Sequence, residues 1–409
     1  MSVPGEIASE TTSTLSSRLG LSGTVIEVGL THPGLRRVLA GAGSTLGFLV
    51  TLDEERITDL EVEIGLGHRG FEKEVESGSW LRALPYVDRL GHAGAPIAAI
   101  AYCSGLELLA GLTLPDRAVW LRTLGAELAR VTDHWARLAA VAAALELPAA
   151  EQTAQEGALQ AAALLASTMG GGPFTDWVRP GGVARGLPED FGEQWRAGRQ
   201  TLDQTLACFD RLGVRNPTCV QRLRDVAPLS AEQALAWSVT GPALRATGLP
   251  TDLRRDAPYL AYGSVDFDVP IGERGDGYDR LLVVFEEVRQ SLRIGDQCVA
   301  LLESLGPGPI SVDPPPGLAP GLASENGPGP VAEPVGLAAG EVAVAIEAST
   351  GELGFLLVSD GSALPRRIRC RAPSFFHAQV LPLLLRGAEL DDLLPTAAGL
   401  HIVSGECDR

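Results

Sequence analysis

Residues 115–147, PDRAVWLRTLGAELARVTDHWARLAAVAAALEL, decide the fold class of this chain. Apolar residues recur there at the three- and four-residue spacing of a helix. Pro115 stands ahead of the run, where a proline favours the start of a helix. The stretch therefore predicts one long helix over residues 118–147.

The periodicity stays mostly helical from about residue 71 to residue 305. Further helices are expected at residues 154–168, 189–212 and 278–305, and Ser230-Ala-Glu-Gln has the pattern of a capping box that opens another. Several long helices in succession predict a bundle. The runs rich in β-forming residues lie outside this region, at 24–28, 45–52, 57–64, 341–346, 354–358 and 366–371.

The fold class predicted from these patterns is α+β. It is mainly a helical bundle, with a small N-terminal antiparallel β region and a C-terminal β/α region. The expected divisions are a flexible leader (1–22), the N-terminal β region (23–65), the helical core (66–305), a Pro/Gly-rich linker (306–340) and the C-terminal β/α region (341–409).

Composition excludes several classes of function. The net charge of −18 argues against a nucleic-acid partner and against direct adsorption on anionic lipid. The longest apolar run, residues 138–150, is interrupted by Glu146 and is too short to span a bilayer. Residues 1–18 are polar and lack the pattern of a secretory signal. We expect a cytoplasmic chain whose membrane contact comes only through partners.

The six cysteines form no C-x-x-C pair, so neither a disulfide framework nor a thiolate metal cage is expected. Reduced and mostly buried thiols are predicted instead. The chain also lacks a G-x-G-x-x-G motif followed by an acidic residue, a P-loop and an H-E-x-x-H motif, which leaves little support for a stand-alone enzyme.

Several strings occur in an order that is far more specific than any one of them. They are IGLGHRGFEK (64–73), LPYVDRL (84–90), RPGGV (179–183), GPALRATG (241–248), FDVPIGERGD (267–276), GELG (351–354), VSDG (358–361), RAPSF (371–375) and GECDR (405–409). Together they resemble the D-type subunit of the NADH-quinone oxidoreductase (complex I) family, as a divergent member. That family shares its fold with the large subunit of [NiFe] hydrogenases, which hold their metals with two C-x-x-C pairs that are missing here.

The resemblance implies a core subunit of a complex I-type NAD(P)H-quinone oxidoreductase. Such a protein docks on the subunit that carries the terminal [4Fe–4S] cluster and forms part of the quinone cleft. The chain itself would bind no cofactor, because the cluster belongs to the partner and the quinone is the acceptor. NADH would bind elsewhere in this electron-transport complex. The implied partners are the B-type iron–sulfur subunit, a C-type subunit and an H-type membrane subunit, on the cytoplasmic side of the membrane.

Three residues match positions that lie beside the cluster in the family. Arg69, in the string with His68, and Arg89 would bring positive charge close to the cluster and raise its reduction potential. The alternative is that both arginines only pair with local carboxylates such as Asp88 or Glu72.

Two histidines are the candidates for the quinone side. His32 resembles the first histidine of a family hairpin loop whose second histidine, the expected headgroup donor, is missing here. His92 stands where the family has a headgroup tyrosine, and an imidazole can donate a hydrogen bond and a proton near neutral pH. The alternatives are a surface turn residue for His32 and a solvent-facing or core histidine for His92.

Because the second hairpin histidine is missing and a histidine replaces the headgroup tyrosine, two hypotheses remain for the function of the chain. The first is a working subunit of a complex I-like oxidoreductase with a changed acceptor site. The second is a catalytically degenerate structural or assembly subunit of a complex I-like or membrane-bound hydrogenase-like complex.

Overall fold

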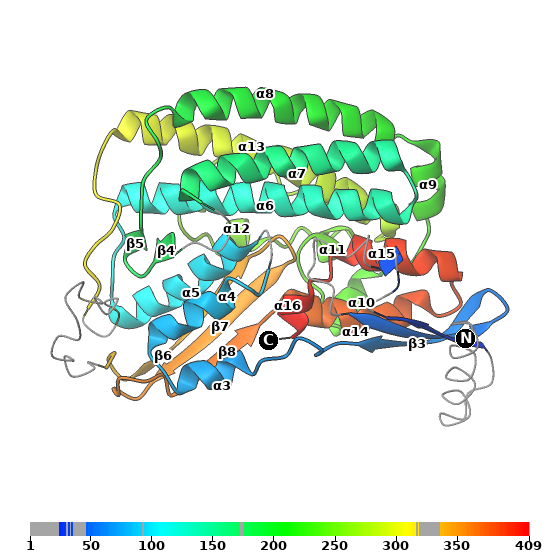
Figure 1. The fold of residues 1–409 in the computed structure, drawn as a ribbon, viewed down its shortest axis with the longest axis horizontal. Helices are drawn as coiled ribbons and strands as arrows, with labels where there is room; N and C mark the ends of the chain where they lie inside the picture. Colours follow the sequence, from blue (N-terminus) through cyan, green and yellow to red (C-terminus); the bar gives the residue numbers. More distant parts are fainter. Residues whose placement is uncertain are drawn as a thin grey trace, which may run out of the picture.

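The computed structural model describes residues 24–29, 32, 34–35, 46–91, 94–171, 176–315, 318 and 336–408. The predicted flexible leader, residues 1–22, and residues 319–335 of the predicted linker lie outside this part. Figure 1 shows a layer of long helices stacked on a layer of sheets and shorter helices, with the C-terminus in the second layer.

The helical layer consists of α6 (Asp116–Ala144), α7 (Pro148–Met169), α8 (Phe191–Phe209) and α13 (Gly277–Leu305), which lie side by side (Figure 1). Glycines let these helices approach closely. A Cβ atom added to Gly157 of α7 would lie 2.6 Å from the ring of Trp135 on α6. One added to Gly295 of α13 would lie 2.3 Å from the ring of Trp195 on α8. Alanine at either glycine would therefore push the helices apart.

The N-terminal sheet is antiparallel and contains β1 (Thr24–Val28), β2 (Gly47–Asp53) and β3 (Arg56–Glu63). Strand β3 packs against α14 (Pro373–Leu385), more than 300 residues later in the chain. Two backbone hydrogen bonds fix this contact: Ile57 N–H donates to Ala388 O at 2.9 Å, and Gly387 N–H donates to Ile57 O at 2.7 Å. The N-terminal sheet and α14 are therefore parts of one structural layer.

The C-terminal sheet, β6 (Gly340–Glu347), β7 (Glu352–Ser359) and β8 (Arg367–Arg371), is also antiparallel. Helix α5 (Ala95–Ala110) packs on β6 and β7, and α3 (Phe71–Glu76) packs on β8. Gly105 makes the first contact possible, because an added Cβ atom would lie 2.7 Å from the side chain of Leu357.

The remaining elements are short and connect the layers. They are η2 (Trp80–Ala83), α4 (Leu84–Val87), the hairpin strands β4 (Val178–Arg179) and β5 (Gly182–Val183), the π-helical turn η3 (Asp210–Val214), α9 (Pro217–Leu223), α10 (Ala231–Ala236), α11 (Pro242–Arg245), α12 (Leu253–Asp256), η4 (Tyr262–Ser264), η6 (Leu390–Asp392), α15 (Leu393–Leu400) and α16 (Ser404–Cys407). Within the described residues, no helix has the length and apolar character needed to cross a bilayer.

The predicted α+β class is confirmed, with two differences inside the bundle. The helix predicted over residues 118–147 stops at Ala144, and Pro148 opens α7, because a proline that would interrupt one helix can begin the next. The capping box at Ser230 is formed, but α10 has only six residues. It ends before Ser238, whose φ of 56° is left-handed.

A buried network of charged groups joins the two layers. Glu287 of α13 accepts hydrogen bonds from Arg245 Nε at 2.8 Å and from His134 Nε2 at 2.8 Å. Arg245 Nη1 lies 2.7 Å from Glu347 Oε1, at the end of β6. All four side chains are almost completely buried. Breaking such a pair strands a charge in the core, so the network holds α6, α11, α13 and β6 in one arrangement.

The network continues around Glu127 of α6. Arg254 of α12 lies 3.3 Å from Glu127 Oε2 and 2.7 Å from Asp252 Oδ2. Tyr262 donates its hydroxyl to Glu127 Oε1 at 2.5 Å, and Arg130 Nε donates to the same oxygen at 3.2 Å. Although burial raises the pKa of Glu127, Arg130 and Arg254 outweigh it, and the pKa is lowered. The carboxylate is therefore ionised inside the core.

His134 makes folding sensitive to acid. Burial lowers its pKa from 6.5 to about 4, against the opposing effect of Glu287. Between these two pH values the unfolded chain takes up a proton at His134 that the folded chain does not, so stability falls as the pH falls. From pH 7 to pH 5 this single group removes about 2 kcal/mol from the free energy of unfolding.

We expect His134→Gln to make this pH dependence shallower by about 2 kcal/mol, because the amide can still donate to Glu287 but does not titrate. The measurement is urea unfolding, followed by circular dichroism, at pH 7 and pH 5. Thr132→Val is the matched control, since Thr132 is a buried, non-titrating residue on the same helix. An equally steep pH dependence in His134→Gln would show that other groups carry the effect.

Candidate functional site

The loop that contains His68 and Arg69 is held in shape by a distant carboxylate. Asp408 accepts a hydrogen bond from Gly65 N–H at 2.6 Å and another from Gly67 N–H at 2.9 Å, one on each oxygen. Gly65 has a φ of 93°, which is unfavourable for residues with a side chain. The loop therefore turns tightly after β3, and the side chains of His68 and Arg69 are exposed.

The two arginines that the resemblance predicts to lie beside the cluster, Arg69 and Arg89, both contact the short helix α4. The Arg69 guanidinium lies over the ring of Tyr86, with its carbon 5.4 Å from the ring centroid. Arg89, three residues after Tyr86, donates from Nη1 to Pro85 O at 2.5 Å. Both arginine side chains are exposed. The structure thus places two cations from different parts of the chain on one corner of the molecule.

The local carboxylates behave differently from each other. Glu72 accepts from Cys370 N–H at 2.8 Å and lies 3.6 Å from Arg367, so it ties α3 to β8. Asp88 is buried, and burial with the nearby Asp176 raises its pKa to about 7, while Arg89 acts in the opposite direction. Of the two carboxylates named in the alternative, Glu72 therefore pairs with Arg367, and Asp88 is close enough to Arg89 for the charge of the arginine to act on it.

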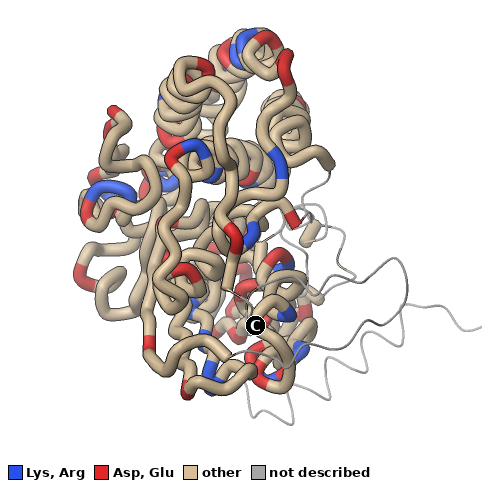
Figure 2. Tube along the Cα trace, turned by 90° about the vertical axis from the view of Figure 1, so that its left-hand side faces the viewer, with Lys and Arg blue, Asp and Glu red and all other residues tan. Residues whose placement is uncertain are grey.

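Residues 404–408 fasten this corner to the rest of the molecule, and we call them the 404–408 latch. Gly405 packs so closely on the chain after α4 that an added Cβ atom would lie 2.4 Å from Arg89 O. Glu406 accepts from Ser374 Oγ at 2.5 Å and from Thr350 Oγ1 at 2.7 Å. Figure 1 places α16 between the second sheet and α14, and Figure 2 shows charged residues of both signs around the C-terminus.

A second set of buried polar groups lies behind the latch. Asp133 of α6 is 3.2 Å from His401 Nε2 and accepts a hydrogen bond from the Ser349 hydroxyl. Although burial raises the pKa of Asp133, His401 and Ser349 outweigh it and hold the pKa below the usual range. Neither a sequence motif nor any of the strings that resemble the family contains Asp133, Ser349 or His401. Charged residues recur every three or four positions from Glu127 to Arg137, a spacing that could have indicated a polar stripe.

His32 stands in a turn. Its Nδ1 accepts from Leu35 N–H at 3.4 Å, and Gly34 lies close to both the His32 ring and Leu394 of α15. The side chain is exposed. This geometry accords with the surface-turn alternative, although the residues that complete the loop, 36–45, lie outside the described part. His92 also lies outside the described residues.

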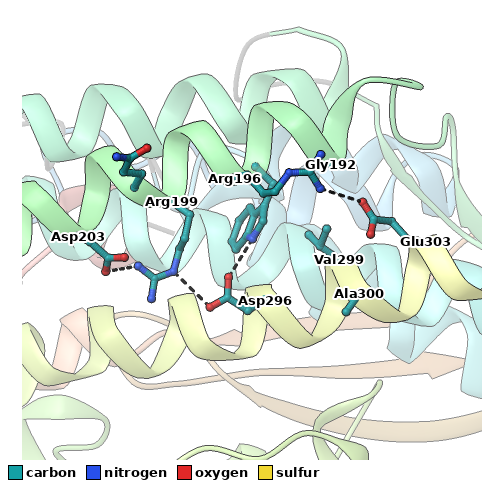
Figure 3. A pocket seen from close by; sticks show the side chains of 10 residues that line it. Gly192, Arg196, Arg199, Asp203, Asp296, Val299, Ala300 and Glu303 are labelled. Carbon is teal, nitrogen blue, oxygen red and sulfur yellow. Dashed lines mark hydrogen bonds and ion pairs between the residues drawn. The ribbon is translucent and has the colours of Figure 1, made fainter.

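A wide groove lies elsewhere, between α8 and α13. It has a volume of about 440 Å³. Figure 3 shows that its charged side chains face one another: Arg199 reaches Asp296 at 3.3 Å, and Arg196 reaches Glu303 at 3.9 Å. Trp195 Nε1 donates to Asp296 at 2.9 Å. These groups satisfy each other across the two helices, which gives the groove a structural role.

Metal-binding residues are not gathered in the described part of the chain, which contains no cluster of three or more His, Cys, Asp or Glu side chains suited to an ion. Five of the six cysteines are buried. Burial raises the pKa of Cys219 to about 12, which makes its thiol unreactive.

Comparisons with known proteins support the family that the ordered strings resemble. The family described as "Respiratory-chain NADH dehydrogenase, 49 Kd subunit" matches residues 160–409. The D-type NADH-quinone oxidoreductase subunit of Myxococcus xanthus (strain DK1622) is 37% identical, over 97% of this chain and 95% of the relative. The D-type subunit of Pelobacter propionicus (strain DSM 2379 / NBRC 103807 / OttBd1) is 34% identical, over 94% of this chain and 95% of that protein.

A third relative is longer than this chain. The fused C/D-type NADH-quinone oxidoreductase subunit of Bdellovibrio bacteriovorus (strain ATCC 15356 / DSM 50701 / NCIMB 9529 / HD100) is 36% identical, over 89% of this chain and 66% of that protein. Near-full-length identity at this level, together with the family match, shows common descent. The chain therefore belongs to the D-type, or 49 kDa, subunit family of NADH-quinone oxidoreductases.

Proposed function

We propose that the corner formed by residues 64–70 and α4 docks on an iron–sulfur subunit and forms one wall of a quinone cleft. The observation that carries the proposal is the geometry of this corner. A tightly held loop presents the exposed side chains of Leu66, His68 and Arg69, and Arg89 lies at the end of the helix that Arg69 covers. Leu66 is 59% exposed, and an exposed leucine on the same loop as an exposed arginine is typical of a binding surface.

The proposed electron path needs no cofactor on this chain. Electrons reach the quinone from a [4Fe–4S] cluster held by a B-type partner, and Arg69 and Arg89 stabilise the reduced cluster electrostatically. His68 lies on the same loop and would face the same partner. A C-type subunit is a further proposed partner, which the fused C/D name of the Bdellovibrio relative supports. An H-type membrane subunit would hold the assembly at the cytoplasmic face of the membrane.

The structural-subunit alternative also has an observation in its favour. His32 uses Nδ1 to accept a hydrogen bond from its own turn, which leaves less of the imidazole available to a quinone headgroup. In this alternative the same corner docks on the iron–sulfur partner but no quinone is reduced. The decisive experiment is to purify the complex through a tag on this chain and to assay NADH-dependent reduction of a short-chain quinone. Co-purified iron–sulfur protein without quinone reduction would favour the structural role.

We expect Arg69→Met and Arg89→Met each to lower the reduction potential of the partner's cluster. Removing a unit charge at a partly buried interface is worth roughly 1–4 kcal/mol at an effective dielectric constant near 20. The measurement is a redox titration of the intact complex followed by EPR. Arg82→Met is the control, because Arg82 is exposed and pairs with Glu74 at 3.3 Å. Unchanged potentials in both variants would mean that the two arginines serve only local contacts.

The latch gives a separate prediction about docking. Asp408→Ala removes both acceptors of the Gly65 and Gly67 amides, so the loop should lose its fixed shape. We expect faster hydrogen exchange at these two amides and binding to the iron–sulfur partner weakened by about tenfold, for a loss of roughly 1.4 kcal/mol. Asp360→Ala, which removes the acceptor for Ser362 N–H in a surface turn, is the control. Full partner affinity in Asp408→Ala would separate the latch from docking.

A further inference from the structure

A small enclosed cavity lies where the latch, α6 and the turn between β6 and β7 meet. Its volume is about 10 Å³, enough for the centre of one water molecule. Its polar wall consists of Asp133, Ser349, Thr350 and Glu406, and its apolar wall includes Leu90. Two carboxyl groups and two hydroxyl groups therefore surround space for one water, directly under the chain that follows α4.

The two carboxyl groups differ in the direction of their pKa shift. Asp133 is kept ionised by His401 at 3.2 Å and by the Ser349 hydroxyl. Burial raises the pKa of Glu406, although hydrogen bonds from Ser374 and Thr350 oppose the change. A carboxyl group whose pKa is lowered and one whose pKa is raised thus both line the cavity. A water between them can accept a proton from one side and pass it on.

His401 supplies a second proton-carrying group. Its Nε2 faces Asp133, while Nδ1 is buried and makes no hydrogen bond to any described residue. The ring also lies close enough to Glu406 to act on its charge. An imidazole held by a carboxylate at one ring nitrogen, with no hydrogen bond to a described residue at the other, is suited to exchange protons.

We infer that Glu406, the Asp133–His401 pair and one water in the cavity form a proton relay toward an acceptor bound beside Leu90 and Gly91. The inference rests on the proposed quinone reduction. The partner's cluster supplies two electrons, and two protons complete the quinol. Glu406 gives up its carboxyl proton through the water to one quinone oxygen. His401 gives up a ring N–H proton for the other, and both groups are then reprotonated from solvent. Asp133 stays ionised and orients His401.

The charged and titratable groups around the relay come from several elements. The charges of His134, Arg137 and His401 act on Asp133. The charge of His401 acts on Glu406, and those of Arg137, His401 and Arg371 act on His377 of α14. Among these, the cavity is lined only by Asp133 and Glu406. His377 therefore offers a nearby buried histidine outside the relay.

The test uses the intact complex with Glu406→Gln and His401→Gln. Each amide keeps hydrogen-bonding capacity but cannot deliver a proton. We expect quinone reduction to fall about a hundredfold, the loss typical of a missing acid–base group, with a larger solvent isotope effect. Reduction of ferricyanide, which takes up electrons without protons, should stay unchanged. His377→Gln should keep the quinone rate. Rates and isotope effects equal to those of the unmodified complex would overturn the relay.

Two further results would also be decisive. Loss of ferricyanide reduction together with quinone reduction would overturn the relay in favour of a structural role for these residues. An unmodified complex that reduces no quinone would overturn the proposed function, and the relay with it. A readout other than activity is the redox-induced infrared difference spectrum. A carboxylic C=O band that shifts in D₂O should be present in the unmodified complex and absent in Glu406→Gln, and a band unaffected by the substitution would contradict the relay.

Discussion

The contact on which the rest of the structure depends is the buried pairing of Glu287 with Arg245 and His134. It joins the two longest helices, α6 and α13, and Arg245 extends it to the end of β6 through Glu347. Desolvating these charges costs several kcal/mol per ion, and the cost is offset only when every partner is in place. Such a network tolerates little displacement, so the helical layer forms a fixed platform for the second layer.

The fixed position of the helical layer is important because the second layer consists largely of short elements and loops. The loop at residues 64–70, the end of α4 and the latch have little regular structure of their own. They are joined by a few specific contacts, such as the two hydrogen bonds that Asp408 accepts from backbone amides and the packing of Gly405 against Arg89 O. A surface built in this way is shaped by the core beneath it, and its shape follows from the placement of a few groups rather than from any one helix or strand.

Periodicity and turn chemistry predicted most of the framework. The strands at 24–28 and 57–64, the long helices and the α+β class follow from apolar spacing, which is a local property. Strings in family order placed Arg69 and Arg89 near one site, and the structure brings both to α4. The Asp133–His401 pair could not be predicted this way, because its members are 268 positions apart and neither stands in a recognisable motif. The charged stripe on α6 looks like a solvated face until the other elements are seen to cover it.

The bond between Gly65 and Asp408 spans 343 positions of the chain. The ribosome makes the chain from its N-terminus at about 5–20 residues per second. Asp408 is therefore synthesised tens of seconds after the loop that its carboxylate binds. Until then the loop that carries His68 and Arg69 lacks the contact that shapes it. The corner can therefore reach its final form only after nearly all of the sequence up to residue 408 has emerged, so the docking proposed for this corner would be a late event that requires completed folding.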